Sequence, residues 1–150
     1  MNKIIYIILL STFLISQTIK GGEVAEGLDL ADIKMAKHID YTRVVFYVNW
    51  WEGHTKPNTP ADTTGSYTFV LSDDNKSIEV ELSGFRSATV KDIKLVDTIK
   101  SIEELKGEKY ADDSSIFYKI NLTDKASEIK AFTLKSPARI ILDIYQKIQN

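Results

Sequence analysis

Aromatic side chains gather at one predicted loop and could bind a sugar. Trp50 and Trp51, the two tryptophans of the chain, stand at the start of a loop that runs from Asn49 to Gly65. Tyr47 precedes them and Tyr67 follows the loop. Because an indole face complements the flat C–H face of a sugar ring, an exposed aromatic patch here is a candidate glycan-binding site.

Strand alternation limits that hypothesis. Consecutive residues of a strand point to opposite faces, so at most one of Trp50 and Trp51 is free to bind. In the alternative interpretation, one indole belongs to the core and the other covers its edge. The sequence does not choose between the two tryptophans.

A second set of candidates consists of arginines that could bind a carboxylate. Arg139 and Asp143 lie four residues apart on a predicted strand, so their side chains share a face. The planar guanidinium of Arg139 suits the carboxylates of a peptide stem. The alternative is a cross-strand charge pair that steadies the sheet, which we favour for Asp143 and leave open for Arg139. Arg43 falls on the equivalent strand position of the opening segment Ala31–Val48, and both interpretations apply to it.

Catalytic patterns are weak throughout. His38 and His54 are the only histidines and lack a His-Glu-x-x-His spacing, so no metal site is expected. No Gly-x-Ser-x-Gly elbow and no phosphate-binding glycine loop occurs, and no cofactor is implied. A paired-carboxylate glycosidase stays open, because that chemistry leaves no local motif. The adjacent acid pairs lie in turn-like sequence, where solvated acids are ordinary: Asp73-Asp74, Glu103-Glu104 and Asp112-Asp113.

Short strands must position these residues. Alternating or β-branched runs separated by polar turns predict strands, and their spacing predicts a β-sandwich. The clearest are Thr42–Val48, Ser66–Leu71, Ile78–Leu82, Ser115–Ile120 and Ile140–Ile144. Ser101 and Glu104 form a capping-box pattern with Gly107 as a stop, which predicts one short helix in the second half.

The same order of units occurs twice, which predicts two pseudo-repeated β units around one core. Asp32–Met35 is echoed by Asp92–Leu95. We align Arg43–Val48 with Ser115–Ile120, Phe69 and Leu71 with Phe132 and Leu134, and Ile78, Val80 and Leu82 with Ile140, Leu142 and Ile144.

The N-terminus predicts export. Lys3 precedes the apolar run Ile4–Ile15, which has the length of a signal-peptide core and is short for a membrane span. We expect a signal peptide over residues 1–22 and a domain over 23–150. Cleavage is expected near Thr18 or Gly21-Gly22, and an uncleaved membrane anchor is the alternative.

Composition excludes several kinds of site and partner. The chain has no cysteine, so disulfides and thiolate metal sites are excluded. Of 19 basic residues, Lys3 and Lys20 fall within 1–22, which leaves 17 against 21 acidic ones. Nucleic-acid binding requires a basic face, so we expect no nucleic-acid partner and contact with a membrane only through an uncleaved signal segment.

Two stretches resemble a known family. Ala31–Val48, ADIKMAKHIDYTRVVFYV, resembles the opening of an AMIN domain, and Phe132–Ile144, FTLKSPARIILDI, resembles its closing half. The resemblance runs from about Leu30 to Tyr145. It implies a two-fold β-sandwich that is periplasmic and non-catalytic and that holds cell-wall amidases or secretin pores at the envelope through peptidoglycan. The insertion after Trp51 is long for that family, and no amidase or secretin portion follows Tyr145. Of the family's functions, we therefore expect only binding to the wall or to a partner in this chain.

These observations lead to a periplasmic or secreted, non-enzymatic module that binds peptidoglycan or an envelope protein. One alternative is a protein-interaction module that docks on an envelope secretion or pilus machine. A small cell-wall hydrolase is a third hypothesis. The expected ligand-binding residues are Arg139, Trp50, Trp51, Arg43, Tyr47 and Tyr67.

Overall fold

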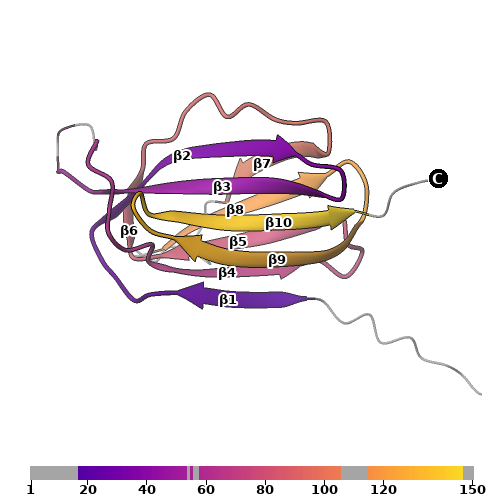
Figure 1. Ribbon diagram of the computed structural model, residues 1–150, viewed down its shortest axis with the longest axis horizontal. Coiled ribbons are helices and arrows are strands. Elements are labelled where there is room, and N and C mark those ends of the chain that lie inside the picture. The colour runs from indigo at the N-terminus through magenta and orange to yellow at the C-terminus, as the bar shows by residue number, and fades with distance from the viewer. Residues whose placement is uncertain (1–16, 54, 56–57, 106–114, 147–150) are drawn as a thin grey trace, which may run out of the picture.

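A computed structural model describes residues 17–53, 55, 58–105 and 115–146 of the chain. This part is all-β, with two packed five-stranded sheets and no helix (Figure 1). None of its elements is a helix long and apolar enough to cross a membrane. The strands are β1 (Thr18–Gly22), β2 (Leu28–Lys37), β3 (Tyr41–Trp50), β4 (Ser66–Leu71), β5 (Ser77–Ser83), β6 (Phe85–Ala88), β7 (Ile99–Glu104), β8 (Ser115–Leu122), β9 (Ala126–Leu134) and β10 (Arg139–Gln146).

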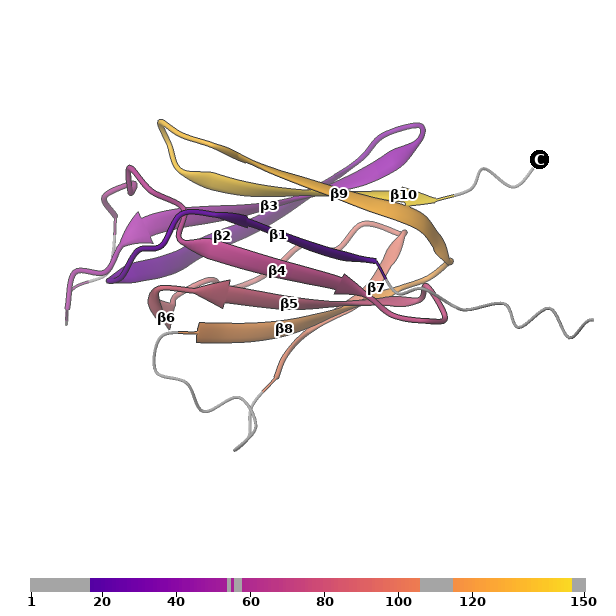
Figure 2. The ribbon, with the colours of Figure 1, turned by 90° about the horizontal axis from the view of Figure 1, so that it is seen from below.

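The two sheets form separate layers, which Figure 2 shows edge-on. Sheet A has the order β1-β4-β5-β8-β7, and sheet B has the order β6-β2-β3-β10-β9. All neighbours pair antiparallel except β2 and β6, which are parallel. The prediction of packed β-sheets is therefore confirmed.

Alternating burial explains why these segments pair face to face. Along β3, even-numbered residues from Thr42 to Val48 are buried and the odd-numbered ones between them are not. β4 and β5 alternate in the same way. One face of each sheet is therefore apolar, and the two apolar faces close on a core with Phe46 and Phe69 near its centre, their ring centroids 5.9 Å apart.

The strand orders of the two sheets correspond. Sheet A contains β4-β5-β8-β7, and sheet B, read from its other edge, contains β9-β10-β3-β2. Exchanging the first four-strand group (β2 to β5) with the second (β7 to β10) thus interchanges the sheets. Each sheet adds one further edge strand, β1 beside β4 and β6 beside β2.

The ladder registers correct the alignment of the two halves. Phe69 lies opposite Val80, and Ala131 lies opposite Leu142, so Ala131 is the counterpart of Phe69 once Val80 is aligned with Leu142. The sequence had aligned Phe69 with Phe132. A one-residue error reverses the face, and Phe132 is indeed 38 % exposed whereas Phe69 is fully buried.

Two other sequence expectations also change. Phe46 pairs with Ile140 as Ile120 pairs with Ile78, so the counterpart of Phe46 is Ile120, two residues beyond the aligned Tyr118. This two-residue shift preserves the face, which is why periodicity alone did not reveal it. Asp92–Leu95 is not a strand; the counterpart of β2 is β7.

The predicted helix is wrong over its first turn. Ser101–Glu104 belongs to β7, where Glu103 pairs with Lys119 of β8. A capping box depends on only two side chains. Pairing with the edge of β8 gives this segment a hydrogen-bonded ladder from Ser101 to Glu104 instead. The remainder of the predicted helix, including Gly107, lies outside the described residues.

The expected signal segment is described only at its end. Residues 1–16 lie outside the described part, while Thr18–Gly22 forms β1 and pairs with β4 in a continuous register from Thr18 opposite Val70 to Gly22 opposite Ser66. The end of the predicted 1–22 segment is thus a strand of sheet A.

The corrected alignment can be tested by two alanine variants. We expect Phe69→Ala to lower the free energy of unfolding by about 3–5 kcal/mol, because it empties a fully buried site. Phe132→Ala should cost less than about 1 kcal/mol, because its ring is on the outer face. Urea unfolding measures both, and equal losses would contradict the register.

Candidate binding face

Sheet B presents an outer face on which strand register lines up side chains in rows. Lys34, Val45, Ile141 and Phe132 form one row across β2, β3, β10 and β9. The rows beside it are Ala36-Arg43-Asp143-Lys130 and Asp32-Tyr47-Arg139-Leu134. We call these twelve residues the sheet B face.

A two-pronged ion pair lies in one of the flanking rows of the sheet B face, between Ala36 and Lys130. Arg43 Nε donates to Asp143 Oδ1 and Arg43 Nη2 donates to Asp143 Oδ2, both at 2.8 Å. Asp143 is only 4 % exposed, and its hydrogen bonds raise the pKa of the Arg43 guanidinium. The cross-strand partner of Asp143 is thus Arg43, the residue opposite it in the ladder, and not Arg139.

Aromatic rings frame this pair. The Arg43 guanidinium lies 5.4 Å from the Tyr41 ring centroid and 5.3 Å from that of Phe132. Ile141 points to the same side as Asp143 but is almost fully buried, so its neighbours on the outer face cover it. Arg43 is therefore held by a carboxylate and two rings, and its contacts are those of a structural residue.

Arg139 is placed differently. Its side chain is at the surface, where Nε donates to the Pro137 carbonyl at 2.9 Å. Tyr47 lies opposite it, with the Lys34 ammonium 5.1 Å from the Tyr47 ring centroid. The Arg139 guanidinium is not committed to a carboxylate in the described part of the chain, so it can take one from a ligand.

A polar groove of about 1030 Å³ adjoins the face at the end of β2 and β3. Trp51 forms one wall, and its indole is 40 % exposed with the Arg86 guanidinium 4.9 Å from the ring centroid. The groove shares Asp32 with the sheet B face. Its lining comprises Ala31, Asp32, Asn49, Trp51, Gly53, Thr55, Asn58, Ser87, Ala88, Thr89, Lys91 and Asp92.

A buried carboxylate orients two hydroxyls of this groove. Asp29 is fully buried and accepts from Ser87 Oγ at 2.6 Å and from Thr89 Oγ1 at 2.7 Å. Because each hydroxyl proton is directed at Asp29, the oxygens of Ser87 and Thr89 offer only lone pairs to anything else. The groove therefore presents fixed acceptors that suit a ligand rich in hydroxyl or amide donors.

The structure gathers four of the six predicted ligand-binding residues. Arg43, Tyr47 and Arg139 lie on the sheet B face, and Trp51 lines the adjoining groove. Trp50 packs against the core, so the two indoles do point to different sides, as alternation predicted. Tyr67 is only 6 % exposed, and burial raises the pKa of its hydroxyl, so it belongs to the core and not to the site.

Sequence reasoning missed the contributors from β6 and the segment after it. Ser87 and Thr89 come to Asp29 only because β6 pairs in parallel with β2, and a four-residue strand gives little periodic signal. Phe132 was aligned with a core residue and so was not considered. The alternation of Lys130, Phe132 and Leu134 with Ala131 and Thr133 was the available signal.

The residues considered for catalysis do not converge in the described ranges. His38 stacks on Tyr41 at 4.6 Å, Asp73 and Asp74 lie in the turn before β5, and Glu103 and Glu104 are on β7. No cluster of three or more His, Asp or Glu side chains there could hold a metal ion. His54 and the pair Asp112-Asp113 lie outside the described residues.

Comparison with known proteins gives no match, whether to protein-family models, to curated proteins or to solved structures. The sheet B face and its groove combine an available guanidinium, an exposed indole and oriented hydroxyls.

Arg43 and Arg139 should differ sharply in their effect on stability. We expect Arg43→Gln to lower the free energy of unfolding by about 2–3 kcal/mol, because it strands the buried Asp143 carboxylate. Arg139→Gln should change it by less than about 0.5 kcal/mol, as is usual for a surface residue. Chemical denaturation measures the free energy of unfolding of both variants. An unchanged value for Arg43→Gln would show that the ion pair is not what stabilises the face.

Proposed function

We propose that this chain is an exported, non-catalytic module that attaches to peptidoglycan through the sheet B face and the Trp51 groove. The observation that carries the proposal is that the Arg139 guanidinium, which has no carboxylate partner among the described residues, and the exposed Trp51 lie on one side of one sheet. Asp32 of the groove and Arg139 belong to the same row, two strands apart, which places their backbones about 10 Å from each other.

The Trp51 groove suits the glycan strand of peptidoglycan, and Arg139 suits its stem peptides. Its glycan strand offers sugar faces, hydroxyls and acetamido N–H groups, which match the Trp51 indole and the acceptor oxygens of Ser87 and Thr89. Its stem peptides carry carboxylates, which match Arg139.

The opposite face is a poorer candidate for such a ligand. Glu79, Glu81 and Glu103 point outward from sheet A beside Lys119. These three carboxylates outnumber the ammonium groups of Lys119 and of Lys20, which lies in the row of Glu81, so this face would repel the acidic stem peptide. On the sheet B face Asp143 is paired with Arg43 and Asp32 with Lys34, while Lys130, beside Glu128, and Arg139 supply further positive charge.

The resemblance to AMIN domains points the same way. That family is expected to have a two-fold β-sandwich, and the corresponding strand orders of the two sheets support our proposal that the halves are copies of one β unit. The insertion after Trp51, which is long for the family, contributes a wall of the groove through Thr55 and Asn58. We propose on this basis that the module acts in the periplasm or outside the cell.

Sedimentation with purified insoluble peptidoglycan tests the proposal. We expect the wild type to sediment, and Trp51→Ala and Arg139→Ala each to weaken binding about tenfold, as loss of an interface anchor worth 1–2 kcal/mol does. Lys119→Ala, on the opposite sheet, is the matched control and should bind normally. Folded wild type that stays in the supernatant would remove wall binding.

One observation favours a protein partner as the second candidate. Phe132 and Leu134 of the edge strand β9 are exposed side by side on the sheet B face, and apolar edge residues suit docking of another protein. Co-purification of a single envelope protein, with no wall in the fraction, would select this function. Clearing of a wall suspension by the protein alone would instead support a hydrolase.

A further inference from the structure

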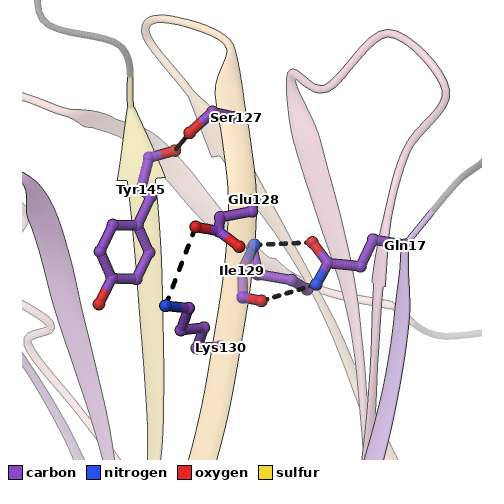
Figure 3. A network of polar contacts seen from close by, with 6 residues as sticks. All are labelled: Gln17, Ser127, Glu128, Ile129, Lys130 and Tyr145. Atoms are coloured by element: carbon purple, nitrogen blue, oxygen red, sulfur yellow. Dashed lines mark hydrogen bonds and ion pairs between the residues drawn. The ribbon is translucent and has the colours of Figure 1, made fainter.

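Gln17 joins the two sheets at the edge where β1 and β9 lie near each other (Figure 3). Its side-chain Nε2 donates to the Ile129 carbonyl, and its Oε1 accepts from the Ile129 N–H, both at 2.8 Å. Its own main-chain carbonyl accepts from Leu71 N at 2.8 Å. One residue thus bonds to β4 of sheet A through its backbone and to β9 of sheet B through its amide.

The position of Ile129 explains why this contact matters. β9 is the edge strand of sheet B, and the Ile129 backbone groups face away from β10 while its side chain is fully buried in the core. Unpaired strand edges expose N–H and C=O groups that bind other chains. β4, the counterpart of β9, is covered by β1, whereas on β9 the Gln17 amide replaces one residue of such a neighbouring strand.

The residues after Gln17 are equally built into the fold. A side chain at Gly21 would collide with the Tyr67 hydroxyl, and Gly22 has φ of +84° against the Gly65 carbonyl. Glu23 N donates to the Gly65 carbonyl at 2.9 Å, and the Glu23 carboxylate accepts from Lys135 Nζ at 2.7 Å. The stretch from Gln17 to Glu23 is therefore held by specific contacts with the rest of the domain. Gly21 and Gly22 are needed because a larger side chain would collide with Tyr67 or with the Gly65 carbonyl.

We infer that Gln17 is an integral part of the folded domain and that processing during export leaves it on the chain. If a peptidase removes the apolar leader, the peptide bond that it hydrolyses lies before Gln17. Water then adds across that bond, leaving a carboxylate on the leader and an amino group on the domain. This boundary excludes cleavage after Thr18 or at Gly21-Gly22, because either cut would remove the Gln17 amide and strip part or all of β1.

The boundary is tested by expressing the full chain in an exporting bacterium and measuring the intact mass and N-terminal peptide of the folded, exported protein. We expect the N-terminus at or before Gln17, and an uncleaved chain also meets this expectation. An N-terminal glutamine can cyclise with loss of ammonia, and that mass counts as retention. A folded product that begins at Thr18 or later would overturn the inference, whether or not the protein binds peptidoglycan.

The contact itself is tested by amide hydrogen exchange of the full-length protein. In Gln17→Ala we expect the Ile129 amide to exchange at least tenfold faster than in the wild type, because its acceptor is gone. Thr18→Ala is the control, since Thr18 is the next residue along the chain and has an exposed side chain, and it should leave Ile129 protected. Unchanged protection of Ile129 in folded Gln17→Ala would contradict the role given to the amide.

Discussion

The register between β3 and β10 determines both the core and the outer surface of sheet B. In this register Phe46 meets Ile140 on the inner side, while Arg43 meets Asp143 on the outer side. A shift by one residue would bring the charges into the core and the apolar side chains to the surface, at a cost that includes burying ions. The ion pair and the apolar core therefore specify the same pairing, and the positions of Arg139 and Tyr47 follow from it.

The ion pair also separates two roles that look identical in the sequence. Arg43 and Arg139 are both arginines on outward-facing positions of paired strands. Arg43 has a buried carboxylate and two aromatic rings around it, so it supports the face. Arg139 bonds only to the Pro137 carbonyl among the described residues and stays at the surface. A ligand-binding face needs both kinds of residue, because a rigid support keeps the recognising side chain in place.

Strand periodicity predicted much of this fold. Ser66–Leu71 was predicted at its observed bounds, and the segments around Val44, Val80 and Leu142 are strands as predicted. Alternation also predicted that Trp50 and Trp51 would separate. What periodicity could not supply was register: the alignment of Phe69 with Phe132 differs from the true one by a single residue, and only the ladder of β9 with β10 reveals that.

The remaining features depend on contacts between segments distant in sequence. Ser101–Glu104 has the local spacing of a helix start, yet pairing with β8 overrides it. Asp29 is hydrogen-bonded to Ser87 and Thr89, which lie about sixty residues away in the sequence. Gln17 is hydrogen-bonded to Ile129, more than a hundred residues away. A single sequence carries no local trace of such partners, so the groove and the edge contact became visible only in three dimensions.

The most direct test of the account is to map a bound wall fragment residue by residue. A soluble disaccharide-peptide released from peptidoglycan can be titrated into isotope-labelled protein while amide and indole resonances are followed by NMR. If the fragment binds at the sheet B face and its groove, the perturbed resonances cluster at Trp51, Ser87, Thr89, Tyr47 and Arg139, with the outer face of sheet A unchanged. Perturbations confined to sheet A, or none at saturating fragment, would contradict it.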